Sequence, residues 1–197
     1  VVPRLQPVLG RRIGVNDRTG ALREEIARSD VDREHFRSEW LRYAEDVMRE
    51  VGEASTVREA AQKVVAFLEA VLELDAAAIA LDIEPNKPPS VVAKSGDNTG
   101  PATKILDRET ETYQWIMENE TALLIRRGRS PMAGIQREIV KFSLGPCAFV
   151  PIMASGRFAG VLVCSRDPGM DPLQDSAFHL MRIAANAMTL RLGTDLS

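Results

Sequence analysis

Two apolar runs separated by Ser155-Gly156 constrain the fold of this chain more than any other feature of its sequence. The first run extends from Pro146 to Ala154 and the second from Arg157 to Ser165. A Ser-Gly pair between two runs rich in β-branched and apolar residues is typical of a tight turn. The sequence therefore predicts an antiparallel β-hairpin in the last third of the chain.

The rest of the chain supplies further strands and helices. Apolar spacing and turn residues predict strands over 76–83, 90–95 and 122–125. Helices are expected over 21–51, 56–72, 103–119 and 171–192, with a shorter helix ending near Phe142. Thr56 and Glu59 have the spacing of a capping box at the start of the second helix. This order predicts an α+β fold, a central antiparallel sheet with helices on both faces, preceded by an N-terminal helix.

The N-terminal helix carries one apolar stripe on an otherwise charged surface. Its apolar residues follow one another at steps of four, three, four and four positions: Phe36, Trp40, Tyr43, Val47 and Val51. A narrow stripe of this kind is typical of a helix that buries one seam against a partner helix. We therefore expect these five residues to form a dimer interface. The expected organisation is a linker over 1–20, this helix over 21–52 and a folded domain over 53–197.

Charge, apolar runs and cysteine content narrow the class of protein. The 25 basic and 28 acidic residues give a net charge of −3, so no overall positive field is available to hold a nucleic acid. The longest apolar runs, such as 76–81 and 159–164, are far shorter than the ~20 residues that cross a bilayer. Two cysteines, and no charged-then-apolar leader after Val1, favour a cytoplasmic segment of a longer polypeptide. We therefore expect no nucleic-acid partner, no membrane contact and an output domain elsewhere in the parent chain.

Four stretches of the sequence together resemble one known family. They are Leu74–Leu81, Val92–Gly96, Phe149–Ile152 and Gly160–Val163, and the last two form a proline-bearing strand and a Gly-Val-Leu strand before the final helix. In this order they resemble a GAF domain, and the resemblance covers Ser55 to about Leu192. It implies a GAF/PAS-like sheet with the first and last helices on one face. The other face of the sheet is usually a ligand pocket in that family.

The resemblance implies a sensory or regulatory role. GAF relatives bind cyclic nucleotides, tetrapyrroles, haem, iron or small metabolites, and their outer helices often associate into parallel bundles. We therefore expect a non-catalytic module that forms a homodimer through its outer helices, binds a small anionic ligand such as a cyclic nucleotide, and regulates an attached output domain. One alternative is a degenerate member whose pocket is filled by side chains and which acts as a dimerisation or docking scaffold. A second is a thiol redox enzyme of the free methionine sulfoxide reductase type.

The loop after the third expected strand is the best candidate for an anion site. Arg126, Arg127 and Arg129 surround Gly128, whose backbone freedom lets the loop present forked guanidinium groups. A phosphate or carboxylate would suit such a cluster. The alternative is a solvated loop whose charge is balanced by neighbouring glutamates.

Aromatic side chains are the candidate walls of a pocket. Tyr113 and Trp115 lie on the middle helix, and Phe149 and Phe158 lie on the hairpin. Alternation along the strands groups the two phenylalanines with Cys147, Met153 and Leu162 on the bulkier face of the hairpin, which we expect to face the pocket. Ordinary core packing is the alternative for all four aromatic residues.

The cysteines and histidines are the remaining candidates for chemistry. A two-residue turn at Ser155-Gly156 would place Cys147 opposite Cys164, close enough for a strained disulfide. Pro146 and Pro151 favour a bulge that would shift this register, and inert packing of both thiols is the alternative. The only histidines are His35 and His179, so we expect no metal or haem site, and the sequence identifies no cofactor.

Overall fold

The structure, a computed structural model, describes residues 39–84 and 87–195. The expected linker over 1–20, and the part of the N-terminal helix before residue 39 that includes Phe36, lie outside the described residues. The chain divides into two compact units, 1–41 and 42–197. All contacts reported below lie within the second unit. The described chain begins in a helix that continues to residue 53.

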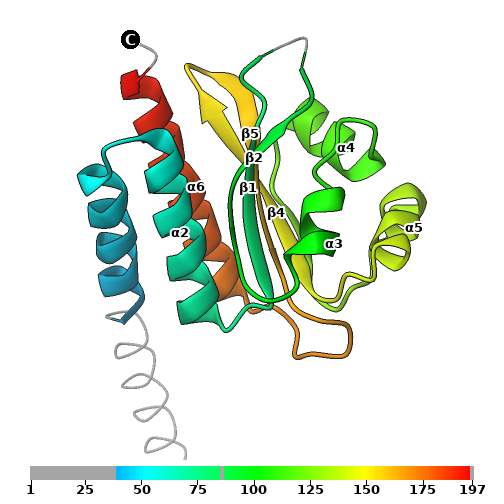
Figure 1. The fold of residues 1–197 in the computed structure, drawn as a ribbon. Coiled ribbons are helices and arrows are strands. Elements are labelled where there is room, and N and C mark those ends of the chain that lie inside the picture. The colour runs from blue at the N-terminus through cyan, green and yellow to red at the C-terminus, as the bar shows by residue number, and fades with distance from the viewer. Residues whose placement is uncertain (1–38, 85–86, 196–197) are drawn as a thin grey trace, which may run out of the picture. The chain divides into compact units, whose positions relative to one another are not determined.

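Five antiparallel strands form one sheet in the order β2-β1-β5-β4-β3 (Figure 1). Their bounds are Ala76–Leu81 for β1, Ser90–Ser95 for β2, Leu123–Ile125 for β3, Cys147–Ala154 for β4 and Arg157–Ser165 for β5. β1 is buried along its whole length, as its apolar sequence requires, whereas β2 and β3 lie at the two edges. The predicted antiparallel sheet and its C-terminal hairpin are confirmed.

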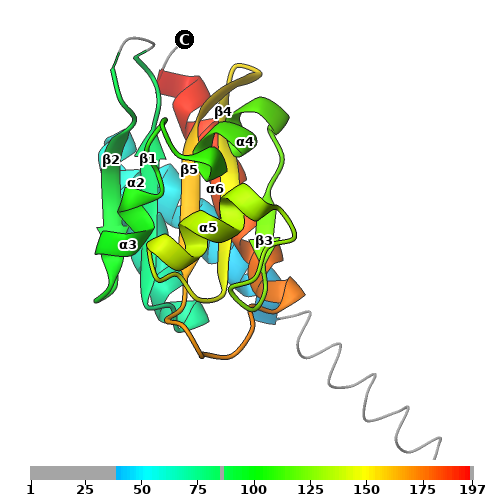
Figure 2. The same cartoon turned by 90° about the vertical axis from the view of Figure 1, so that its right-hand side faces the viewer.

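Helices cover both faces of the sheet, as predicted. α2 (Val57–Leu72) and α6 (Asp175–Asp195) pack on one face, and Figure 1 shows them side by side. α3 (Thr99–Lys104), α4 (Glu111–Asn119) and α5 (Ala133–Lys141) lie over the other face, which Figure 2 turns toward the viewer. The first and last helices of the α+β domain therefore share a face and leave the opposite face to the three short helices.

The start of α2 follows the predicted capping box. The Thr56 hydroxyl accepts the backbone N–H of Glu59 at 3.1 Å, and the Glu59 carboxylate accepts the backbone N–H of Ser55 at 2.8 Å. These bonds satisfy donors that the first turn of a helix cannot pair internally. The helix ends at Glu73, whose left-handed backbone (φ 50°) closes the last turn.

The single helix predicted over 103–119 is wrong, because the structure divides this segment into α3 and α4. α3 begins at Thr99, inside the predicted loop, and ends at Lys104. Thr110 starts α4 as its N-cap: its hydroxyl accepts the N–H of Tyr113 at 3.2 Å and donates to the carbonyl of Ile105 at 2.8 Å. A threonine side chain that bonds to nearby backbone groups favours a helix start over a helix interior.

A β-bulge in the C-terminal hairpin corrects the predicted register. Met153 pairs with Phe158 as a two-residue turn requires, but Ile152 pairs with Gly160, so one residue of β5 is extra. The shift lies between Ile152 and Met153, one residue beyond Pro151, which has no N–H to give to the sheet. Beyond the bulge Cys147 pairs with Ser165 and Cys164 pairs with Ala148. The two cysteines are therefore not opposite each other, and the alternative prediction, a bulge that shifts this register, is confirmed.

Residues 42–53 pack on α2 and leave only part of their apolar stripe exposed. Val47 and Val51 are 0% and 4% exposed. Tyr43 contacts Phe67 of α2 in an edge-to-face arrangement with 6.3 Å between ring centroids. Burial of the two valines and the ring contact of half-buried Tyr43 fix the helix against the domain.

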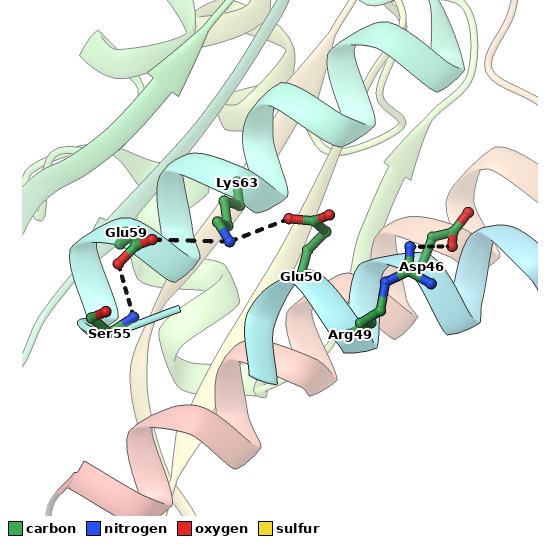
Figure 3. A network of polar contacts seen from close by, with 6 residues as sticks. All are labelled: Asp46, Arg49, Glu50, Ser55, Glu59 and Lys63. Atoms are coloured by element: carbon green, nitrogen blue, oxygen red, sulfur yellow. Dashed lines mark hydrogen bonds and ion pairs between the residues drawn. The ribbon is translucent and has the colours of Figure 1, made fainter. Parts of the chain in front are cut away.

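Polar side chains also join the helix that ends at residue 53 to α2. Lys63 of α2 lies between Glu50, at 3.3 Å, and Glu59, at 3.9 Å, and so links the two helices (Figure 3). Asp46 and Arg49 form a separate pair at 2.6 Å on the outer side of their own helix (Figure 3). These exposed pairs add little energy individually, so the apolar contact dominates.

Candidate functional site

The space between the sheet and α3, α4 and α5 is filled by apolar side chains. The core on this side contains sixteen buried residues, contributed by four strands and by the helices and loops above them: Ala76, Ala78, Ala80, Ala102, Ile105, Leu106, Tyr113, Ile116, Ile125, Ile135, Ile139, Leu144, Cys147, Phe149, Val161 and Val163. The bulge explains why two β5 residues, Val161 and Val163, share a face with Cys147 and Phe149. The predicted grouping of Leu162 with this face is wrong, since Leu162 pairs with Val150.

Two of the four predicted pocket walls are completely buried in this core. Tyr113 and Phe149 are both 0% exposed. A side chain without accessible surface borders no space large enough to hold a water molecule. Trp115 and Phe158 are half-buried and pack against the edge of the core, and Phe158 meets the Tyr113 ring edge-on at 5.6 Å. The structure thus brings Tyr113 and Phe158 together, but as packing partners.

A polar cluster that sequence reasoning missed lies beside Tyr113. Asp82 directly follows β1, and its side chain is only 6% exposed. The Arg108 guanidinium donates through Nε to Asp82 Oδ2 at 2.9 Å and through Nη2 to Oδ1. The Tyr113 hydroxyl donates to the same Oδ2 at 3.3 Å. Burial, and then the negative charge of Asp82, raise the pKa of Tyr113 well above its usual range.

Chemically, this cluster holds a neutral phenol and a paired carboxylate in place. The hydrogen bond with Asp82 and the ion pair raise the pKa of Arg108, which keeps the guanidinium charged. The only signal available in the sequence was an aspartate at the end of a buried strand. Because Arg108 lies 26 positions away in a segment predicted as helix, no local pattern could pair the two.

The predicted anion site lies at the other end of the sheet. Arg126, Arg127 and Arg129 are exposed in the loop after β3. Ile125, at the end of β3, pairs with Cys147, whereas Phe158 pairs with Met153. Six residues of β4 separate these positions, which corresponds to about 20 Å at the rise of an extended strand. The arginine loop and the Tyr113–Phe158 pair are therefore not parts of one pocket.

The three arginines differ in their contacts. Arg126 forms an ion pair with Asp175 at the start of α6. Arg127 and Arg129 form no ion pair with any residue in the described part of the chain. Gly128 has a left-handed backbone (φ 66°) and lies against Gly145, so the loop needs glycine here, as predicted. This surface offers two exposed guanidinium groups.

Helices α4 and α5 each place a glutamate carboxylate at the first turn of the other helix. Glu138 of α5 accepts the backbone N–H groups of Glu111 and Thr112, at 2.6 and 2.8 Å, and the Thr112 hydroxyl at 2.6 Å. Glu111 of α4 in turn bonds to Arg137 at 2.8 Å, and its carboxylate occupies the space that a Cβ on Gly134 would take. A negative charge at a helix N-terminus is stabilising, so each helix holds the other.

The two thiols are buried and separate. Cys147 belongs to the core under α3, α4 and α5, whereas Cys164 pairs with Ala148. Because adjacent residues of a strand point to opposite faces, Cys164 faces α2 and α6. Burial raises the pKa of both thiols above the usual range. A thiol held protonated is a poor nucleophile, so this arrangement does not favour redox chemistry at neutral pH.

Within residues 39–84 and 87–195, no group of three or more His, Cys, Asp or Glu side chains is arranged to hold a metal ion. His179 is exposed on α6, and His35 lies outside the described residues. Among the described helices, none has the length and apolar character needed to span a bilayer.

Comparison with known proteins supplies the family. The sequence model of the GAF domain matches residues 56–192, which is more than two thirds of the chain. The chain belongs to the GAF family. None of the curated proteins matches this GAF domain in sequence.

Solved structures of other GAF domains share the fold at low sequence identity. The GAF domain of Acinetobacter phosphoenolpyruvate-protein phosphotransferase has a TM-score of 0.64 at 13% identity and covers 79% of this chain and 93% of that one. The corresponding domain from Coxiella burnetii has a TM-score of 0.64 at 17% identity, with 80% and 94% covered. The Stigmatella aurantiaca phytochrome photosensory core module has a TM-score of 0.63 at 13% identity, with 79% of this chain and 36% of that one covered. These likenesses confirm the predicted GAF fold.

The predicted dimer residues of this GAF domain differ in burial: Phe36 lies outside the described residues, and Trp40 is half-buried. Val47 and Val51 are covered within the chain itself, and Tyr43 contacts Phe67. Apolar surface remains at Met48, which is 42% exposed, and at Leu190 of α6, which is 61% exposed. The two valines therefore have almost no surface left for contact with a partner helix.

Proposed function

We propose that this GAF domain is a non-catalytic regulatory module that acts as a dimerisation and docking scaffold through its outer surfaces. The complete burial of Tyr113 and Phe149 carries this proposal, because the face of the sheet that holds a ligand in many relatives is here packed with the chain's own side chains. The buried, protonated thiols support a role without catalysis. Attachment to an output domain in a longer chain belongs to the same proposal.

A dimer would form through the outer helices on the side of α6. Met48 on the helix that ends at residue 53 and Leu190 on α6 supply exposed apolar surface on these outer helices, and large apolar side chains left in water favour association. Regulation would require two states of the dimer in which these helices pack differently. A docked partner would shift the equilibrium between the two states by the difference in its affinity for them.

A second candidate is a sensor of a small anion, such as a cyclic nucleotide, bound at the arginine loop. Arg127 and Arg129 favour it, because both are exposed and neither forms an ion pair with another residue of the described ranges. The site would then lie on the surface at the end of β3, away from the filled core.

A thermal-shift measurement with cyclic mono- and dinucleotides separates the two candidates. A ligand that binds only the folded chain raises the melting temperature with a saturable concentration dependence. The scaffold proposal predicts no such rise. A saturable rise that is lost in the triple variant Arg126→Ala, Arg127→Ala, Arg129→Ala would instead support the sensor. A rise that survives in this variant would contradict both.

A further inference from the structure

The outer edge of β2 is bordered by a groove that is separate from the filled core. β2 is the end strand on its side of the sheet, and Figure 2 shows it at the margin opposite β3. A hollow of about 360 Å³, here called the β2 groove, runs along this edge between α2 and α3. Its lining includes Arg58, Gln62, Val91, Val92, Lys94 and Thr103.

The backbone of Lys94 faces this groove. The Gln62 side chain reaches from α2 and donates through Nε2 to the Lys94 carbonyl oxygen at 3.1 Å. A carbonyl that accepts this bond points away from β1, and the N–H of the same residue in a strand points to the same side. Lys94 therefore presents a donor and an acceptor at the open edge, and an exposed glutamine side chain occupies the acceptor.

Apolar surface continues along the strand from Lys94. The register between β1 and β2 shifts between Ile79 and Ala80, which leaves Val92 without a partner on β1. Val91 beside it is 37% exposed. A second hollow of about 420 Å³ also borders Val92 and includes Ile83, which is 48% exposed. An extended segment laid against β2 would thus cover apolar side chains as well as pair with the backbone.

The charge of the β2 groove is positive on a chain whose net charge is negative. Arg58 and Lys94 line it, its lining contains no carboxylate, and neither cation forms an ion pair with a described residue. A lysine and a bulge on an edge strand oppose pairing with a second hydrophobic edge. They would also bring like charges together if β2 paired with the β2 of another copy. Acidic side chains on an incoming strand would meet complementary charge instead.

We propose that the β2 groove docks an extended, acidic segment of a partner protein, which adds to the sheet as a sixth strand beside β2. Backbone bonds to Lys94 supply the pairing, Val91 and Val92 supply apolar contact, and Arg58 and Lys94 select negative side chains. This surface is distinct from the one proposed for dimerisation, so either proposal can fail without the other.

The test uses the full chain and two synthetic peptides of eight residues, one alternating valine and glutamate and the other alternating valine and lysine. Amide NMR spectra should show saturable shifts at Val92 and Lys94 with the glutamate peptide. Reversal of both groove cations, in Arg58→Glu with Lys94→Glu, should weaken this binding about tenfold and favour the lysine peptide. Gln62→Ala frees the Lys94 carbonyl and should tighten binding by roughly two- to fivefold.

A matched control separates docking from general attraction. Arg157→Glu with Arg182→Glu changes the net charge by the same amount at two exposed positions outside the groove and should leave binding unchanged. An equal loss in this control, or the absence of saturable shifts in the wild type, overturns the proposal. Shifts at Val92 and Lys94 that depend on protein concentration alone would show a second copy at this edge, and would overturn it as well.

Discussion

Tyr113 links the packing of the GAF domain to a deeply placed polar cluster. Its ring is buried in the core and meets Phe158, and its hydroxyl bonds to Asp82, which Arg108 also holds. Burial and the Asp82 charge both disfavour the ionised phenol and raise the pKa of Tyr113. The folded chain therefore keeps this proton at pH values where the unfolded chain loses it.

The stability of the chain at alkaline pH reports this difference. Because the pKa of Tyr113 is raised on folding, its contribution is fully present below pH 10.0, the usual value, and is lost as pH rises above it. The two thiols act in the same direction from about pH 9.0. Above pH 10, Tyr113→Phe should reduce the fall in unfolding free energy by up to about 1.4 kcal/mol per pH unit. Urea unfolding from pH 8 to 11 measures it, and identical slopes in both proteins would contradict the assignment.

At the scale of elements, α4 and α5 behave as one unit because each places a carboxylate at the first turn of the other. Glu138 satisfies two backbone donors of α4 that would otherwise lack intrahelical partners. The Glu111 carboxylate of α4 lies against Gly134 in the first turn of α5. The two helices thus close the filled core together.

Removal of the Glu138 carboxylate tests this coupling. Glu138→Ala should lower the free energy of unfolding by about 1–2 kcal/mol, because two N–H groups and the Thr112 hydroxyl lose their acceptor. Glu118→Ala, an exposed glutamate on α4, is the matched control and should change stability by less than about 0.5 kcal/mol. Equal effects of the two substitutions would show that the contact contributes nothing specific.

The elements also show what the sequence can and cannot predict. Alternation and turn residues were sufficient for the hairpin around Ser155-Gly156, and the Thr56 capping box located the start of α2. The division between α3 and α4 depends on one side chain, Thr110, which caps the start of α4. The spacing of apolar residues over a long window does not detect the effect of a single capping residue. Pro146 and Pro151 indicated a bulge but not its position, and the shift between Ile152 and Met153 gives each earlier residue of β4 a different partner on β5.

The candidate site was less predictable than the fold. Tyr113 and Phe149 were identified as interior residues, but only their packing decides between a pocket wall and a filled core. The sequence could not show how far Arg126 lies from Phe158, and the structure places them near opposite ends of β4. The Asp82–Arg108 pair joins segments 26 positions apart, so no spacing rule could have found it.

At the scale of the whole molecule, the proposed dimer makes a separate prediction. Met48→Glu with Leu190→Glu should give monomers by light scattering on a sizing column, with the melting temperature nearly unchanged, because both side chains are exposed. Val140→Glu on α5, where the valine is 68% exposed, is the control and should leave a dimer. Val47→Glu is unsuitable, because it would bury a charge and unfold the chain. A dimer that persists in the double variant places the interface elsewhere.

The filled core distinguishes this GAF domain from one that encloses a ligand, and it can be tested without choosing a ligand. The volume change of unfolding under pressure scales with the internal void that unfolding removes. Phe149 is completely buried, so Phe149→Ala should open a cavity under α4 and α5.

Pressure unfolding followed by tryptophan fluorescence is therefore the most direct measurement. The wild-type chain should show a small negative volume change, near the ~20 mL/mol end of the range for folded domains. Phe149→Ala should make it clearly more negative. A large negative value in the wild type, left unchanged by Phe149→Ala, would reveal an existing cavity on this side of the sheet and contradict the filled core.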